Sequence, residues 1–279
     1  MKIRSPLRYP GGKTRAIKTI DPLIPKYSEY REPFVGGGSV FAHLKQKYST
    51  KKYWINDLNY DLFLFWKYAK ESNNNLVNEI RRIKTETIDG RELFEMYKGN
   101  WEKYEGLDRA VRFFIVNGLP WPAAIDSGGY SKQSFNKRFT ESSIDRVEKL
   151  EELLVDTRIT NLDYEEVIMT QGEDVFIFLD PPYYSTTNSR LYGKNGDLHA
   201  SFDHKRFANV MKNCNHKWLI TYDDCNEIRN LFNFAEIFPW SLQYGLNIID
   251  QETPGRGKEL FIANYSYQRM NFQINLERE

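Results

Sequence analysis

The sequence predicts an α/β protein built on an open, mostly parallel sheet, and three segments support this prediction. Residues 175–179 form an apolar run without alternation, which is typical of a strand buried on both faces. Residues 31–35 form a second expected strand, followed by three glycines and a helical pattern over 39–44. Residues 53–56 form a third short strand. In such sheets ligands bind at the carboxyl ends of the strands.

The segment Asp180-Pro181-Pro182-Tyr183 follows the apolar run, at the carboxyl end of the predicted strand. The prolines supply carbonyl oxygens but no amide hydrogens, so this edge accepts hydrogen bonds more than it donates them. Asp180 and the carbonyl of Pro181 can each hold one hydrogen of an exocyclic amine on a nucleobase, and Tyr183 can stack on that base. The pattern therefore predicts alkylation of an amino group. Two alternatives stay open: Asp180 caps a turn while Tyr183 fills the core, or the tetrapeptide serves methylation of protein glutamine amides.

The glycine turn and a later aspartate predict a nucleoside-containing cofactor. Glycines at 36–38 allow backbone amides to approach a ligand at a helix amino terminus. The dinucleotide fingerprint is incomplete, because Phe41 occupies the position of its third glycine. Asp57 lies 21 positions after Gly36, where an acidic residue can bind ribose hydroxyls. Asp57 could equally cap, with Asn59, the helix expected to start near residue 60.

The amino-terminal segment 8–14 contains Gly-Lys-Thr, which suggests a phosphate-binding loop. That hypothesis of a nucleotide hydrolase is disfavoured, because Leu7 stands where the first glycine of the loop belongs and no apolar strand precedes it. Lys13 can instead pair with a carboxylate, and the ring of Tyr9 can lie near a cation.

Taken together and in order, these motifs resemble the Dam-type DNA adenine N6-methyltransferases of the group with an amino-terminal lysine motif. The resemblance rests on Tyr-Pro-Gly-Gly-Lys at 9–13, Glu-Pro-Phe-Val-Gly-Gly-Gly at 32–38, Asn-Asp-Leu-Asn at 56–59 and the tetrapeptide at 180–183, with agreement at 161–168 and 255–265. It covers nearly the whole chain. It implies a Rossmann-like, seven-stranded, mostly parallel methyltransferase sheet, with a catalytic domain at 1–58 and 157–279 and a helical target-recognition insertion at 59–156.

The resemblance also implies which residues form the site. Asp180, Pro181 and Tyr183 would be catalytic, acting on the N6 amine of an adenine flipped out of double-stranded DNA. Lys13 would lie near the carboxylate of S-adenosylmethionine, and Asp57 would hold its ribose. The full implied cofactor-binding set is Tyr9, Pro10, Gly11, Gly12, Lys13, Phe34, Gly36, Gly38, Asp57, Asp163, Tyr164 and Asp180, in which Asp163 accepts from the adenine amine and Tyr164 lies against the adenine ring.

Between residues 59 and 158 the pattern changes from strands to helices, with breaks expected at 73–75 and 89–90. The segment 117–138 is aromatic, glycine-rich and basic, which suits contact with a distorted duplex. The family usually has Asn-Arg in this segment, then an aromatic residue, then Asn or Ser followed by Gly. Gly118 replaces the Arg and Pro122-Ala123 replaces the last pair, so the recognised DNA sequence does not follow from the resemblance. The DNA-binding candidates are Trp121, Tyr130, Lys132, Lys137, Arg138, Arg190, Lys194, Arg256 and Lys258.

Composition excludes several other classes of protein. The chain has 279 residues, 41% of them apolar, which suffices for a normal core. Residues 1–10 lack an apolar run, so we expect no signal peptide, and no run approaches the roughly 20 apolar residues that span a bilayer. Two cysteines and four scattered histidines predict free thiols in a reducing cytoplasm and no metal site. Residues 1–31 carry eight basic and two acidic side chains, a net of +6, which form either a phosphate-binding stripe or a solvated helix face.

The expected partners are double-stranded DNA and, as a candidate, a paired restriction endonuclease, with the chain acting as a monomer or weak dimer and no membrane involved. Two alternatives to adenine methylation stay open. The first is a methyltransferase for cytosine N4 or for RNA, since two acceptors suit any flat amine. The second is a non-catalytic DNA-binding protein that retains the fold.

Overall fold

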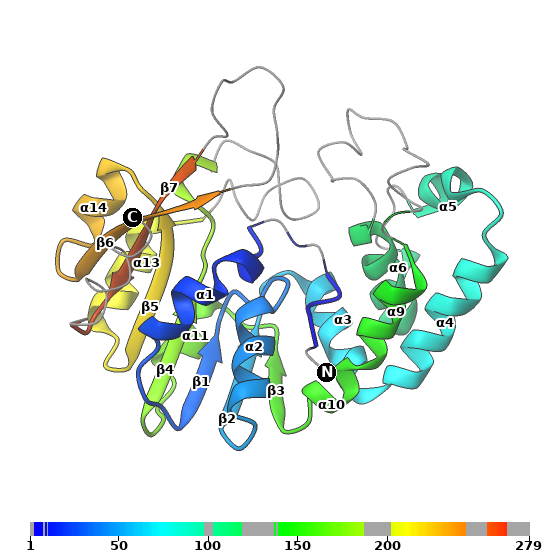
Figure 1. Ribbon diagram of the computed structural model, residues 1–279, viewed down its shortest axis with the longest axis horizontal. Coiled ribbons are helices and arrows are strands. Elements are labelled where there is room, and N and C mark those ends of the chain that lie inside the picture. The colour runs from blue at the N-terminus through cyan, green and yellow to red at the C-terminus, as the bar shows by residue number, and fades with distance from the viewer. Residues whose placement is uncertain are drawn as a thin grey trace.

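The computed structural model describes residues 3–7, 9, 11–97, 103–118, 137, 139–186, 202–243 and 256–266. These residues form one seven-stranded sheet in the order β3-β2-β1-β4-β5-β7-β6 (Figure 1). Strands β1 to β5 are parallel, and β7 runs antiparallel to both β5 and β6. This confirms the predicted mostly parallel sheet. The strands are β1 (Glu29–Glu32), β2 (Lys52–Asn56), β3 (Thr157–Thr160), β4 (Val175–Leu179), β5 (Lys217–Asp223), β6 (Glu236–Gln243) and β7 (Arg256–Ala263).

Strand β4 lies in the middle of the sheet and is buried along its whole length, as its unbroken apolar sequence predicts. Alternate side chains point to opposite faces of a strand. Val175, Ile177 and Leu179 therefore pack in one core cluster, and Phe176 and Phe178 pack in the other. The strand is fixed from both sides, so the residue that follows it has a defined position at the sheet edge.

Strand β1 begins and ends earlier than the predicted segment 31–35, since its last residue is Glu32. The physical reason is Pro33, which has no backbone N–H to donate to the sheet ladder. Beyond Pro33, one further backbone hydrogen bond connects this segment to β2, from the Val35 amide to the carbonyl oxygen of Asn56 at 2.9 Å. The glycine turn therefore starts only a few residues past the strand, directly beside β2.

Helices cover both faces of the sheet (Figure 1). One core cluster joins the sheet to α1 (Ile17–Ile20) and α2 (Ser39–Lys47), and the predicted helix over 39–44 is confirmed. The other joins it to α11 (Tyr164–Met169), α13 (His204–Asn213) and α14 (Asn226–Leu231). The described ranges also contain the short 3₁₀ helices η1 (Lys13–Arg15), η2 (Asp21–Leu23) and η4 (Tyr184–Thr186).

The helical segment lies beyond the β3 end of the sheet (Figure 1). It contains α3 (Tyr60–Glu71), α4 (Asn73–Glu86), α5 (Gly90–Tyr97), α6 (Gly106–Gly118), α9 (Glu141–Glu148) and α10 (Leu150–Leu153). The break expected at 73–75 was wrong, because Asn73 starts α4 after the single residue Ser72. Asn73 is buried, and its side-chain amide donates to the carbonyls of Ala69 and Val147 at 3.0 and 2.9 Å. These two hydrogen bonds connect the start of α4 to α3 and to α9.

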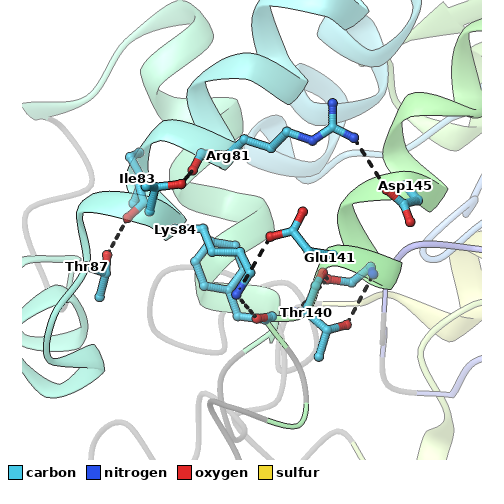
Figure 2. Close-up of polar contacts among 10 residues, drawn as sticks. Arg81, Ile83, Lys84, Thr87, Thr140, Glu141 and Asp145 are labelled. Carbon is cyan, nitrogen blue, oxygen red and sulfur yellow. Dashed lines mark hydrogen bonds and ion pairs between the residues drawn. The ribbon is translucent and has the colours of Figure 1, made fainter.

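Polar contacts within α9 and between α4 and α9 hold the start of α9 in place (Figure 2). Thr140 caps α9 by accepting from the amide of Ser143, and the Ser143 hydroxyl accepts from the Thr140 amide in return. Lys84 of α4 donates to the Phe139 carbonyl at 3.1 Å and lies 4.0 Å from Glu141. Arg81 lies 3.4 Å from Asp145. Exposed ion pairs contribute little stability, so the cap and the buried faces matter more.

Candidate active site

Polar side chains follow several parallel strands along one edge of the sheet, the upper edge in Figure 1. Asn56 ends β2 with Asp57 after it, Asp180 follows β4, and Asp223 ends β5. Because parallel strands end at a common edge, these acidic groups face one region of the molecule. The predicted position of Asp180 at a strand's carboxyl end is confirmed.

Asp180 is held by two side chains. Its Oδ2 lies 2.8 Å from Nζ of Lys13, and its Oδ1 accepts from the hydroxyl of Thr221 at 2.6 Å. Lys13 is only 3% exposed and also donates to the carbonyl of Gly11 at 2.9 Å. An ionised carboxylate has about four lone-pair directions, so Asp180 keeps capacity to accept from a ligand. The structure thus joins the amino-terminal lysine motif to the tetrapeptide.

Tyr183 connects the tetrapeptide to the antiparallel end of the sheet. Its hydroxyl donates to Oε2 of Glu259 in β7 at 2.9 Å, and its ring centroid lies 5.1 Å from Nζ of Lys13. Burial, with the nearby carboxylates of Asp180 and Glu259, raises the pKa of Tyr183 well above its ordinary value. The hydroxyl therefore stays protonated and acts as a donor. Pro181, between these residues, is buried.

The glycine turn packs closely against aromatic rings. Gly36 and Gly38 have φ values of +47° and +65°, a region that side chains rarely adopt. A Cβ at Gly36 would lie 2.9 Å from the ring of Tyr9, and one at Gly38 would lie 2.8 Å from the ring of Trp66. The ring of Tyr9 therefore lies against this turn. Gly11 and Gly12 lie beside Lys13 and are exposed.

Asp57 ties the glycine turn to the start of α3. Its carboxylate accepts from the amides of Gly36 and Asn59, both at 3.0 Å. Burial raises the pKa of Asp57 to about 6, and the two amides lower it in part. The N-cap of α3 is Asn59, whose side chain accepts from the amides of residues 61 and 62. The capping alternative is thus met by Asn59, while Asp57 orders the turn.

Asp163 and Tyr164 lie on the other side of the turn, beside Phe34. The ring of Tyr164 is 5.5 Å from that of Phe34. Asp163 caps α11 through the amide of Glu165, and its two carboxylate oxygens pair with the guanidinium of Arg206 at 2.9 and 3.0 Å. The Arg206 guanidinium also lies 5.0 Å from the Tyr164 ring centroid. Arg206 was not predicted, because its partner lies on another element.

Four further residues of this region carried no predicted role. Glu32 is 3% exposed and accepts from the Tyr30 hydroxyl at 2.6 Å. Burial raises the pKa of Glu32 to about 8, and the carboxylates of Asp180 and Asp57 add to the shift. The others are Thr221, Asp223 and Glu259. For Glu32 and Glu259 the available signal was an acidic residue inside a motif on which the family resemblance rests, at 32–38 and at 255–265.

Three of the DNA-binding candidates lie among the described residues. Lys137 is described and exposed. Arg256 and Lys258 lie on β7 opposite Gln243 and Ser241 of β6. The remaining candidates lie outside the described residues, as do Pro10 of the cofactor-binding set and two of the three departures from the family motif: Trp121, Tyr130, Lys132, Arg138, Arg190, Lys194, Pro10, Pro122 and Ala123. Gly118 is the last residue of α6.

Among the described residues, no group of three or more histidine, cysteine or carboxylate side chains is placed to hold a metal ion. No helix in the described ranges is long and apolar enough to cross a membrane.

Comparisons with known proteins identify the class to which this sheet and acidic edge belong. A sequence profile of the D12 class N6 adenine-specific DNA methyltransferases matches residues 9–246. A type II methyltransferase of Methanocaldococcus jannaschii, M.MjaIII, is 29% identical over 205 residues, which cover 66% of this chain and 70% of the relative. A DNA adenine methylase of Vibrio cholerae is 24% identical over 209 residues, which cover 70% of this chain and 72% of the relative. The DNA N-6-adenine-methyltransferase of Escherichia phage P1 is 25% identical over 246 residues, 82% of this chain and 31% of the relative.

The chain belongs to the D12 class N6 adenine-specific DNA methyltransferase family, and its Rossmann-like sheet is the fold expected for it. The resemblance inferred from the motifs is confirmed, as is the activity it implied, methylation of adenine N6 in DNA.

Proposed function

We propose that the chain uses S-adenosylmethionine to methylate an adenine that has been flipped out of double-stranded DNA, and that Asp180, Pro181 and Tyr183 act on the adenine. The placement of Asp180 supports this most directly. Its carboxylate ends the central strand, is fixed by Lys13 and Thr221, and keeps capacity to accept from an amine. A fixed acceptor beside an aromatic ring is what binding of an exocyclic amine requires.

The charges of the site fit a cofactor that carries a positive sulfur. Asp57, Asp180 and Glu259 are carboxyl groups in this region, and Lys13 is the cation paired with one of them. Burial is the main cause of the raised pKa of Glu32, and the smaller contributions of Asp180 and Asp57 come from their negative charge. When bound, S-adenosylmethionine supplies a methyl group whose bond to the sulfonium breaks as the bond to nitrogen forms. The proposed cofactor-binding residues are Tyr9, Pro10, Gly11, Gly12, Lys13, Phe34, Gly36, Gly38, Asp57, Asp163, Tyr164 and Asp180.

The residues of the tetrapeptide orient the adenine. Asp180 and the Pro181 carbonyl each accept one hydrogen of the N6 amine, which turns the nitrogen lone pair out of the ring plane. Tyr183 stacks on the base and offsets part of the cost of unstacking it, a few kcal/mol. As an acceptor of the amine hydrogen, Asp180 is also placed to take the proton that the methylated nitrogen releases. Orientation of bound reactants then lowers the barrier.

The DNA contacts belong to the same proposal. We assign target recognition to the helical segment 59–156, with phosphate and base contacts from the predicted basic and aromatic residues, of which Lys137 is described and exposed. A paired restriction endonuclease is proposed because one relative is named a type II methyltransferase. We further propose a monomer or weak dimer and a cytoplasmic location, in keeping with free thiols at Cys214 and Cys225.

Product analysis tests this function. The purified chain is incubated with methyl-tritiated S-adenosylmethionine and unmethylated duplex DNA, and the DNA is digested to nucleosides. We expect the label in N6-methyladenine. Label in N4-methylcytosine, label only when RNA is supplied, or no transfer to any of a diverse set of duplexes would contradict the proposal.

A further inference from the structure

Glu259 is a buried carboxylate that the sheet itself does not require. It lies on β7, opposite Asp223 of β5 and Trp240 of β6 in the strand register, and is 1% exposed. Within the described part of the chain, its Oε1 is buried without a hydrogen-bond partner. A buried acidic group with an unpartnered oxygen destabilises the fold relative to an apolar residue of similar size. Stability therefore gives no reason for a glutamate at this position.

The other oxygen of Glu259 makes the contact that connects it to the site. Oε2 accepts from the Tyr183 hydroxyl at 2.9 Å. The Tyr183 ring centroid lies 5.1 Å from Nζ of Lys13 and 6.1 Å from the ring centroid of Tyr222 in β5. The phenol is thus held from β7 at its hydroxyl, while its ring lies against β5. The hydrogen bond to Glu259 and this ring contact together define the position and the tilt of the ring.

We propose that Glu259 is a positioning residue for methyl transfer, which holds Tyr183 at the angle needed to stack on the flipped adenine. This inference rests on the proposed function of Tyr183. A stacking ring that is fixed before the base arrives loses little freedom on binding, so more of the contact energy is available to hold the extruded base. Without the acceptor, the phenol would have to find another partner, and the ring would lose its fixed tilt.

The electrostatics agree with a functional role. Burial raises the pKa of Glu259 to about 7, with Asp180 and Asp223 adding to the shift and Lys13 opposing it. Strongly shifted acids in a site concentrate at functional positions. The groups that face Glu259 are thus Lys13 at the start of η1, Asp180 and Tyr183 after β4, and Asp223 of β5.

A double-mutant cycle between the two partners tests the proposal. Glu259→Met removes the acceptor and keeps the volume, Glu259→Gln keeps an acceptor oxygen, and Tyr183→Phe removes the hydroxyl from the other side. Ile262→Val, three residues along β7 and fully buried on the opposite face, controls for general destabilisation of the strand. For each variant, the rate of tritiated methyl transfer gives kcat and KM for DNA, calorimetry gives Kd for S-adenosylmethionine, and thermal unfolding gives Tm.

We expect Glu259→Met to lower kcat/KM for DNA about 10- to 100-fold, the range for loss of one buried hydrogen bond, with cofactor Kd unchanged and Tm not lowered. Glu259→Gln should stay within about threefold of wild type, as should Ile262→Val. In the Tyr183→Phe background, Glu259→Met should add little, because the contact is already lost.

Three outcomes would overturn the proposal: wild-type kcat/KM for Glu259→Met, an undiminished further loss in the Tyr183→Phe background, or an equal loss of cofactor affinity. If Glu259→Met does not fold, Tyr183→Phe alone decides, since it must show the same DNA-specific defect, and wild-type kcat/KM would refute the role. Absence of transfer by the wild-type chain would instead overturn the proposed function itself.

Discussion

Lys13 and Asp180 form an ion pair, with Nζ 2.8 Å from Oδ2, that joins the first motif of the chain to the tetrapeptide after β4. The lysine is nearly inaccessible to solvent, whereas the aspartate side chain is 20% exposed. The lysine is therefore a fixed support, and the carboxylate is the partner that can still meet a ligand. The pair also gives Lys13 a second proposed role, support of the proposed catalytic carboxylate, beside its proposed contact with the cofactor.

Replacing Lys13 by Met should therefore affect two processes. Asp180 loses its cationic partner, and the proposed cofactor carboxylate loses its counter-ion, so we expect kcat/KM to fall at least about tenfold and the cofactor to bind more weakly. Lys18→Met, at an exposed position of α1, is the matched control and should leave both unchanged. Filter-bound methyl transfer and calorimetry give the two quantities. Wild-type values for Lys13→Met would show that the ion pair is irrelevant to function.

The buried Glu32 predicts an unusual dependence of stability on pH. Burial raises its folded-state pKa from the ordinary value of 4.5 to about 8, so the folded protein prefers the protonated acid. Its stabilising contribution is complete below its unfolded pKa and is lost as pH rises through about 8, by on the order of a few kcal/mol. Glu259 and Asp57 are shifted in the same direction, to about 7 and about 6.

Chemical denaturation of the cofactor-free protein between pH 6.5 and 9 measures this effect. His204 has a lowered pKa, so its contribution has the opposite sign and is complete above its ordinary pKa of about 6.5. We expect the free energy of unfolding to fall between pH 6.5 and about 8 and to level off above that pH, and Glu32→Gln to remove much of the slope. Glu151→Gln, at an exposed position, should leave the slope unchanged. A flat profile for the wild-type protein would contradict a protonated Glu32.

Gly36 should tolerate no side chain. Its positive φ disfavours alanine, and the added Cβ would lie 2.9 Å from the Tyr9 ring, so Gly36→Ala should cost about 1 to 3 kcal/mol and weaken cofactor binding. Gly37→Ala lacks the positive φ and meets its nearest atom at 3.2 Å, so the loss should be smaller. Thermal unfolding and cofactor titration compare the two. Equal effects would show that neither the backbone conformation nor the contact with Tyr9 matters.

The sequence predicted the features that depend on local pattern. The run at 175–179 needed only its apolar residues to indicate a strand buried on both faces, and that fixed the place of Asp180. The predicted end of β1 lies three residues too late, because Pro33 ends the ladder of hydrogen bonds. Asn73 was taken as a break because its type disfavours helices, whereas tertiary bonds to Ala69 and Val147 decide its role.

Pairings between distant elements could not be predicted from pattern alone. Arg206 reaches Asp163 only because α11 and α13 lie side by side on one face of the sheet. Glu259 faces Tyr183 only because β7 inserts between β5 and β6, a register that no local motif specifies. The division into a catalytic domain and a helical insertion at 59–156 stays a prediction. One continuous core cluster connects the described helices of that segment to the sheet.

The catalytic role of Asp180 is the central claim, and one comparison tests it most directly. Methyl transfer to DNA and equilibrium binding of S-adenosylmethionine are measured side by side for the wild-type chain and for Asp180→Ala. We expect the variant to lose transfer almost completely and still to bind the cofactor measurably, because the other proposed cofactor-binding residues are intact. Transfer by Asp180→Ala at the wild-type rate would contradict it.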